Sequence, residues 1–286
     1  MNLSVLLRRH LAALRALVVI TAITGLAYPL LVLGLAQAVV HDKANGSLIE
    51  RDGEVVGSAL IGQAFTDADG NADVRYFQSR PSAAGDGYDP TATAASNLGP
   101  EDIVDTADRA SLLTQVCGRS KEIGEREGVN GLRPFCTREG VGAVVAVFAE
   151  RAVSVNQICP VRPFLDRYAG LPVVCAQPGE DYATGRIEAV RRGTSDPLAE
   201  RPQVPADAVA ASASGLDPHI SVAYAELQAP RVARERGLAL AVVLASIREH
   251  TADRTLGFMG DPVVNVLELN LALDDILRSS APARRG

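Results

Sequence analysis

The longest apolar stretch of the chain runs over residues 16–40 and contains no charged side chain. A helix needs about 20 apolar residues to cross the hydrocarbon core of a bilayer. The residues just before this stretch include Arg8, Arg9 and Arg15, and arginines and lysines collect on the cytoplasmic side of membrane proteins. The pattern therefore predicts a cytoplasmic N-terminus over 1–15 and one transmembrane helix over 16–40, with all later residues outside the cytoplasm.

Two other interpretations of this stretch are open. The triplet Ala36-Gln37-Ala38 resembles the cleavage site of a secretory signal, but the apolar part of a signal is about 7–15 residues long. A buried helix of a soluble protein would need apolar packing on all its sides. The length of the stretch favours a membrane anchor over both.

Small residues recur at four-residue spacing inside the predicted span, at Thr21, Gly25 and Pro29. Residues at this spacing share one face of a helix, and small side chains there allow a second membrane helix to approach closely. We therefore expect these three residues to pack against a partner helix.

Short apolar runs separated by turn dipeptides characterise residues 41–101, which we interpret as the first part of an extracytoplasmic domain. Asp52-Gly53 lies between the runs 47–51 and 54–56. Aspartate followed by glycine is a frequent two-residue turn in a β-hairpin, so the pattern predicts one here.

Residues 102–205 differ from their surroundings because all four cysteines of the chain lie there: Cys117, Cys136, Cys159 and Cys175. An even number of cysteines in an oxidising compartment suggests two disulfides, for which three connectivities exist. Free buried thiols and a zinc site are the alternatives, although no zinc-like spacing is present. The run 141–148 predicts a buried strand or a short helix, and the three prolines in 194–205 predict a linker.

The pattern of residues 206–286 is mostly helical. Ser221 is placed to cap a short helix, and Pro230 to open a second one that ends at Gly237. Amphipathic runs over 238–250 and 263–277 predict two more helices, although leucines alternate in the last run as in a strand. The whole pattern indicates the α+β class, with one transmembrane helix followed by a mixed α/β domain that carries a cysteine-containing insertion.

Composition narrows the possible functions. Tryptophan is absent and aromatic residues make up 4% of the chain, which disfavours a stacking platform for nucleic acid. The net charge is −6, and it is about −9 beyond the apolar stretch because three arginines precede that stretch. We therefore expect no nucleic-acid partner.

Candidate chemistry is sparse. The four histidines are far apart and form no metal-ligand pattern, so we predict no metal site. Ser214, Asp217 and His219 are too close in sequence for a hydrolase triad, and we interpret 217–219 as a turn that leads to the Ser221 cap. We expect no catalytic residues and no firmly bound cofactor, and Arg231, Arg234 and Arg236 form a candidate basic helix face.

Several longer motifs occur in a characteristic order. These are NGSLI (45–49), GSALIGQ (57–63), YFQSRPSA (76–83), SNLGP (96–100), SASGLDPHIS (212–221), QAPRVAR (228–234) and VNVLELNLALD (264–274). In these motifs the chain resembles the C chain of the Kdp potassium-transporting ATPase. The resemblance covers the apolar span, residues 41–101 and residues 204–275, while the cysteine-containing window replaces a shorter connector.

The resemblance implies a non-transporting, non-enzymatic subunit in the cell membrane. Its partners would be a channel-like potassium-binding subunit, a P-type ATP-hydrolysing subunit and a small membrane peptide. The subunit would support assembly and act as a catalytic chaperone that raises the ATP affinity of the pump subunit, with Gln228 at the position implicated in nucleotide contact. ATP enters only through this resemblance, because the sequence has no phosphate-binding loop. A freestanding, membrane-anchored binding or hydrolytic domain is the alternative.

Overall fold

The computed structural model of the chain describes residues 3–84, 88–89, 91–94, 98–192 and 202–280. Most of the predicted linker 194–205 and part of the motif at 96–100 lie outside these residues. The chain divides into two compact units, residues 1–60 and 61–286.

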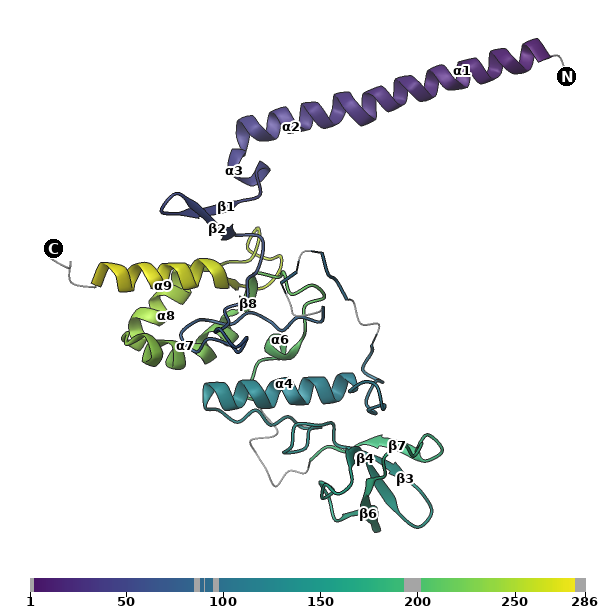
Figure 1. Ribbon diagram of the computed structural model, residues 1–286, viewed down its shortest axis with the longest axis vertical. Helices are drawn as coiled ribbons and strands as arrows, with labels where there is room; N and C mark the ends of the chain where they lie inside the picture. Colours follow the sequence, from purple (N-terminus) through teal and green to yellow (C-terminus); the bar gives the residue numbers. More distant parts are fainter. Residues whose placement is uncertain (1–2, 85–87, 90, 95–97, 193–201, 281–286) are drawn as a thin grey trace. The chain divides into compact units, whose positions relative to one another are not determined.

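The first unit begins with a long helix, drawn in purple in Figure 1. It consists of α1 (Leu3–Ala22), a π-helical turn (Ile23–Ala27) and α2 (Tyr28–Val39). Among the described residues, it is the one helix long and apolar enough to cross a membrane, and none of its most apolar window is buried inside the chain. It begins well before the predicted residue 16, because residues 3–15 are rich in leucine, alanine and arginine, which favour helices.

The π-helical turn lies immediately before Pro29. The backbone N–H of Tyr28 donates to the carbonyl of Ile23, five residues earlier. Proline has no N–H and its ring crowds the preceding turn. A wider turn at this point accommodates the proline without ending the helix.

The hairpin predicted after the helix is confirmed. A short helix α3 (His41–Ala44) is followed by strands β1 (Leu48–Arg51) and β2 (Glu54–Ser58), which pair antiparallel. Asp52 and Gly53 have φ values of 53° and 82°. Positive φ at both central residues is what a type I′ hairpin turn requires.

The larger core of the second unit surrounds helix α7 (Val222–Arg236). The helices α6 (Ala206–Val209), α8 (Leu240–Glu249) and α9 (Val266–Ser280) contribute to it, and so does α4 (Leu112–Glu127) through Ile123. Next to α7 lies a three-stranded antiparallel sheet in the order β8 (His219–Ser221), β10 (Val263–Asn265), β9 (Thr251–Ala252). Figure 1 shows α7, α8 and α9 side by side in green and yellow.

Two predicted helix boundaries in this region are wrong. Ser221 caps α7 by accepting from the N–H of Tyr224 at 3.0 Å, and Gly237 ends it, but α7 continues through Pro230 as one helix. Full burial of Ala225, Ala229 and Val232 offsets the cost of an interior proline, about 3 kcal/mol. The last helix begins at Val266, because residues 263–265 pair with β8 and β9 instead.

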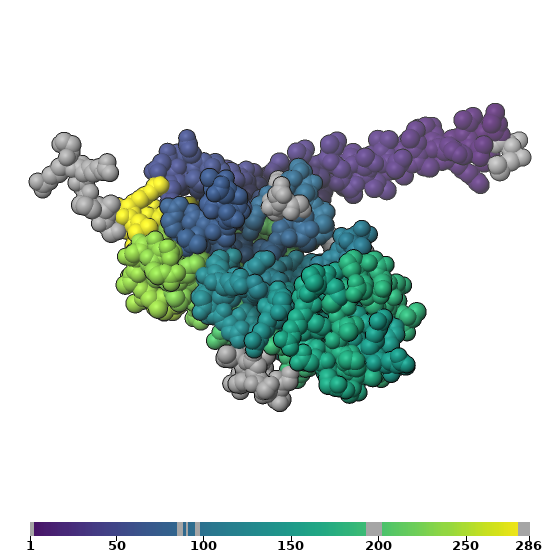
Figure 2. Space-filling model, turned by 60° about the horizontal axis from the view of Figure 1, so that its bottom comes forward, coloured from purple at the N-terminus to yellow at the C-terminus, as the bar shows by residue number. Residues whose placement is uncertain are grey.

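The other part of the second unit is a five-stranded mixed sheet in the order β5-β6-β4-β3-β7. Its strands are β3 (Val144–Val147), β4 (Ala152–Ile158), β5 (Arg167–Tyr168), β6 (Leu171–Ala176) and β7 (Arg186–Ala189). The run 141–148 is thus a buried strand. Alternate residues of β3 enter two apolar clusters, Val144 and Ala146 in one and Val145 in the other. Figure 2 shows this region as a blue-green to green lobe.

Helix α4 connects the two parts. It packs against α6 and α7, while its residue Leu113 contacts the apolar cluster of the five-stranded sheet. The fold is therefore of mixed α+β class with one N-terminal apolar helix that could span a membrane.

Candidate functional site

The Gln228 side chain is completely buried at the centre of α7. Its Oε1 accepts a hydrogen bond from the backbone N–H of Gln78 at 2.8 Å, and its Nε2 donates to the carbonyl oxygen of Gln78 at 3.0 Å. The amide therefore pairs with both backbone groups of one residue, 150 positions away in the sequence.

A second buried amide, that of Asn270, pairs in the same way with both backbone groups of Phe77, the residue before Gln78. Asn270 on α9 accepts from the N–H of Phe77 at 2.9 Å and donates to its carbonyl oxygen at 3.0 Å. Phe77 itself is fully buried. Buried backbone groups outside regular structure need such partners, so α7 and α9 together hold the segment 77–78 in place.

Arg231 extends this network along the same segment. Its Nη1 donates to the carbonyl oxygens of Tyr76, at 3.0 Å, and Val74, and its Nη2 donates to Oε1 of Gln228 at 3.0 Å. Its Nε donates to Oε2 of Glu127 at 2.8 Å, and the side chains of Arg231 and Glu127 are 2% and 0% exposed. A buried pair of this kind is costly to break, because removal of one partner leaves a buried charge.

Glu127 also forms an ion pair with a second arginine, Arg126. Its Oε1 accepts from Nε of Arg126 at 2.8 Å, and Nη2 of Arg126 donates to the hydroxyl of Tyr224 at 3.0 Å. Burial by itself would lower the pKa of Arg126, but the Tyr224 phenol and the Glu127 carboxylate together raise that pKa. Burial also raises the pKa of Tyr224. The guanidinium therefore stays charged and the phenol protonated.

The predicted basic face of α7 is wrong for two of its three arginines. Arg236, like Arg231, points into the molecule and forms an ion pair with Asp274 at 2.7 Å, and it also donates to the carbonyl of Arg75 at 2.5 Å. Only Arg234 has an exposed side chain, which pairs with Glu235. Backbone carbonyls of 74–76, which no strand satisfies, attract the guanidinium groups inward.

These contacts define what Gln228 can do in this fold. Among the described residues, its amide hydrogen bonds go to Gln78 and Arg231. The implied nucleotide contact through this amide would require those bonds to be given up. We therefore regard Gln228, Asn270, Arg231 and Glu127 as one buried clamp on residues 74–78, here called the amide clamp.

The residues predicted for helix packing lie along the membrane-spanning candidate. Thr21 is in α1, Gly25 in the π-helical turn and Pro29 in α2. A Cβ atom built on Gly25 would lie 3.8 Å from Cγ2 of Thr21, so these two residues share a face. All three residues are exposed in the part of the chain that the structure describes.

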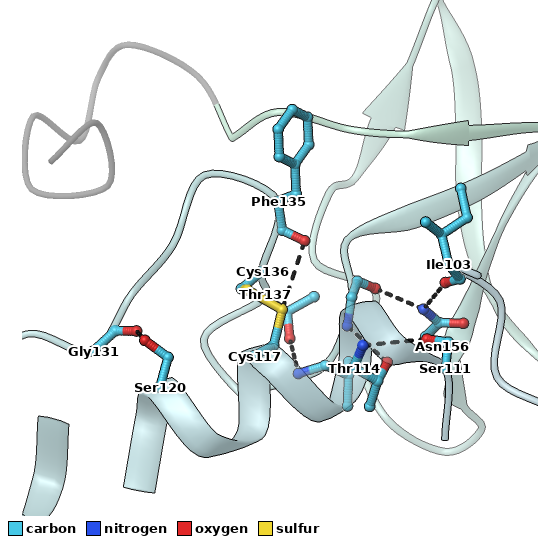
Figure 3. Close-up of a disulfide and its surroundings, with 12 residues drawn as sticks. Ile103, Ser111, Thr114, Cys117, Ser120, Gly131, Phe135, Cys136, Thr137 and Asn156 are labelled. Carbon is cyan, nitrogen blue, oxygen red and sulfur yellow. Dashed lines mark hydrogen bonds between the residues drawn. A yellow bond between two sulfur atoms is a disulfide. The ribbon is translucent and has the colours of Figure 1, made fainter. Parts of the chain in front are cut away.

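The four cysteines lie in two pairs, Cys117 with Cys136 and Cys159 with Cys175, at Cα–Cα distances of 5.5 and 5.2 Å. Figure 3 shows the first pair, which joins α4 to the loop before β3. Beside it the Nδ2 atom of buried Asn156 donates to the carbonyl oxygens of Ile103, at 2.8 Å, and Gly142, at 3.1 Å. The first disulfide and Asn156 thus attach the sheet to α4 and to the segment before it.

Residues 217–219 form the turn that the sequence predicts. The side chain of Asp217 accepts from the N–H of His219 at 3.0 Å, and also pairs with Arg80 at 2.8 Å. Across the described residues, no three side chains of His, Cys, Asp or Glu lie close enough to hold a metal ion.

Sequence reasoning missed most of the amide clamp. The motifs QAPRVAR and VNVLELNLALD contain its members Gln228, Arg231 and Asn270, and YFQSRPSA contains Gln78, which it holds. The sequence does not show that these motifs contact one another, because each buried amide and the backbone groups that it hydrogen-bonds lie more than 100 residues apart.

Comparison with known proteins identifies the family to which the chain belongs. The sequence model of the family described as "K+-transporting ATPase, c chain" matches residues 10–126 and 179–275, most of the chain. The chain belongs to this family. A curated relative from Mycobacterium tuberculosis, named potassium-transporting ATPase KdpC subunit, is 39% identical over 267 residues, which cover 93% of this chain and 98% of that protein.

Proteins of the same name from Rhodospirillum rubrum and Gemmatimonas aurantiaca are 38% and 37% identical. Their matches cover 94% and 95% of this chain, and 97% and 96% of the respective proteins. The chain is thus similar to KdpC subunits along nearly its whole length.

The match to the KdpC family also bears on the cysteine-containing window. The unmatched segment is 127–178, which is narrower than the predicted insertion 102–205. It contains β3 to β6 and three of the four cysteines, whereas α4 lies inside the matched part except for its last residue, Glu127. This agrees with the packing of α4 into the core around α7.

Proposed function

We propose that this KdpC-family chain is the accessory, non-transporting subunit of an ATP-driven potassium uptake complex. Its partners are a channel-like potassium-binding subunit, a P-type ATP-hydrolysing subunit and a small membrane peptide. The observation that carries the proposal is the long N-terminal helix, whose most apolar window has no side chain buried among the described residues. Such a surface needs lipid or the membrane helices of other subunits.

The proposed topology places residues 1–15 in the cytoplasm and the second unit on the extracytoplasmic side of the cell membrane. Arg8, Arg9 and Arg15 support this orientation through the positive-inside rule. The two cysteine pairs add independent support, because disulfides persist in oxidising compartments and are rare in the cytosol.

Assembly is the physical role of a chain built in this way. The helix contacts partner helices through Thr21, Gly25 and Pro29, and the second unit contacts the outer face of the channel-like subunit. Two linked contacts strengthen each other, because the first one raises the effective concentration of the second.

The effect on ATP affinity follows from assembly. The Gln228 amide is engaged with Gln78 inside the amide clamp. We infer that Gln228 acts by maintaining the fold of residues 74–78, and that the chain raises the ATP affinity of the pump subunit by holding the complex together.

The test is purification of the C-terminally tagged chain in mild detergent, followed by mass spectrometry. We expect the channel-like and P-type subunits to co-purify. Recovery of the chain alone, with those subunits expressed at normal levels, would contradict the proposal and favour a freestanding, membrane-anchored domain.

The orientation has its own test, in which intact spheroplasts are treated with a protease. We expect the second unit to be digested from outside. Digestion only after lysis would place the second unit in the cytoplasm.

A further inference from the structure

A cavity of about 300 Å³ lies in the second unit between α4, the segment 78–82 and the start of α7. Its lining includes the arginines Arg80, Arg119 and Arg126, which come from different parts of the chain. Among the described residues, Glu122 is the one carboxylate that lines it. Since the chain as a whole is acidic, a cavity with three guanidinium groups and one carboxylate does not follow from composition.

Hydrogen bonds to other residues of the chain hold each of the three guanidinium groups in place. Arg80 donates to the carbonyl oxygen of Ala210 and to Asp217, and Arg126 to Glu127 and Tyr224. Arg119 donates to the carbonyl oxygen of Val209 and to Oε1 of Gln115, both at 3.2 Å.

These bonds leave one nitrogen of each group unused by the described residues: Nη2 of Arg80, Nε of Arg119 and Nη1 of Arg126. The three guanidinium groups are thus held in place while keeping N–H groups to donate.

Arg119 is the least neutralised of the three. Its guanidinium makes no ion pair with a carboxylate among the described residues, and burial lowers its pKa. Its hydrogen-bond partners are both neutral, and the charge of Glu122 opposes the effect of burial only in part. Such a half-buried cation gains from an added anion.

Hydroxyl groups complete the lining. Ser79, Ser82, Tyr88 and Tyr224 all border the cavity. Burial raises the pKa of Tyr88, so its phenol stays protonated and can donate. Guanidinium groups and hydroxyl donors are the groups that bind phosphate and carboxylate oxygens.

We propose that this cavity binds a small oxyanion of the phosphate type, with Arg119 as its main ligand. The cavity adjoins the amide clamp, because Gln78, which Gln228 holds, and Arg126, which pairs with Glu127, both line it, whereas Gln228 itself does not line it. The proposal goes beyond the accessory-subunit function and does not rest on it. The oxyanion is either free phosphate or the phosphate of a glycerol phosphate headgroup.

The first test is isothermal titration calorimetry of the full-length protein in detergent at constant ionic strength. Inorganic phosphate is the probe, sodium chloride is the blank and sn-glycerol 3-phosphate is the second ligand. We expect saturable one-site binding of phosphate. Tighter binding of glycerol phosphate would identify a headgroup as the source, and tighter binding of phosphate the free anion. If neither ligand saturates up to about 10 mM, the proposal is wrong.

Two matched pairs of variants locate the site. Arg119→Gln should weaken binding about tenfold or more, because a charged hydrogen-bond donor is lost. Arg133→Gln should not, although Arg133 is also half-buried, also bonded to a backbone carbonyl and also has a pKa lowered by burial. Equal loss in both variants would mean that the effect is structural.

The second pair of variants tests for tighter oxyanion binding, which misfolding cannot produce. Glu122→Gln removes the carboxylate from the cavity and should tighten binding about threefold. Glu125→Gln changes an exposed carboxylate of the same helix that does not line this cavity, and should have a smaller effect. Equal or absent tightening would overturn the assignment of the site.

Discussion

At the scale of single residues, the fold of the second unit depends on polar side chains that satisfy backbone groups. The amide clamp holds a segment that belongs to no strand, using two amides and one guanidinium group. Residue types alone do not reveal this. Gln228 and Arg231 look like surface residues of a polar helix, and only their distant backbone partners make them part of the core.

Gln228→Ala should destabilise the second unit by about 2–4 kcal/mol, because it leaves the N–H and C=O of Gln78 without partners and opens a cavity. Thermal unfolding followed by circular dichroism measures the loss. Gln177→Ala, at an exposed position, is the control and should change stability by less than about 0.5 kcal/mol. A Gln228→Ala protein of unchanged stability but reduced ATP effect in the complex would contradict the structural role and favour direct nucleotide contact.

At the scale of elements, the sequence predicted what local patterns determine. The Asp52-Gly53 hairpin, the Ser221 cap and the Gly237 helix end follow from turn and capping chemistry within a few residues. The errors arose where tertiary packing overrides local preference. Burial carries α7 through Pro230, and strand pairing takes residues 263–265 away from the last helix.

Pro230→Ala should stabilise the second unit by about 1–2 kcal/mol. The change restores an N–H for the carbonyl of Glu226 and removes a ring clash, while the unfolded chain gains some freedom. Pro230 is exposed, so no core contact is lost. The melting temperature measures the gain, with the exposed loop variant Pro178→Ala as control. Destabilisation by Pro230→Ala would show that the proline has a packing role in α7.

Gly25→Leu should reduce co-purification of the partner subunits several-fold, because a large side chain prevents close approach of a second helix. Leu30→Ala, at an exposed position outside this four-residue series, is the control and should leave recovery unchanged. Unchanged recovery with both Gly25→Leu and Pro29→Ala would show that this face of the helix does not contact a partner.

At the scale of the whole molecule, one cysteine pair lies within the five-stranded sheet and the other joins the loop before that sheet to α4. Cys159 and Cys175 close a loop with a sequence separation of 16 and tie β4 to its parallel neighbour β6. The sequence located the four cysteines in one window but left three connectivities open. The sequence-based prediction also assigned α4 to this cysteine-containing window, because the local sequence pattern does not show that Ile123 enters the core around α7.

A Cys159→Ala/Cys175→Ala double variant should lose about 3 kcal/mol of local stability in the five-stranded sheet, according to the chain-entropy account of loop closure. Hydrogen exchange with mass spectrometry should show faster exchange in β4 and β6 and unchanged exchange in α7 and α9. Faster exchange over both regions would mean that the sheet and the core around α7 unfold together.

The role proposed for this KdpC-family chain is to hold a potassium-transporting ATPase together. The most direct measurement is the amount of P-type subunit recovered with a tagged channel-like subunit, in cells that make the chain and in cells that lack it. We predict that recovery falls strongly in cells without the chain and returns when the full chain is supplied. Equal recovery in both kinds of cell would contradict the assembly role.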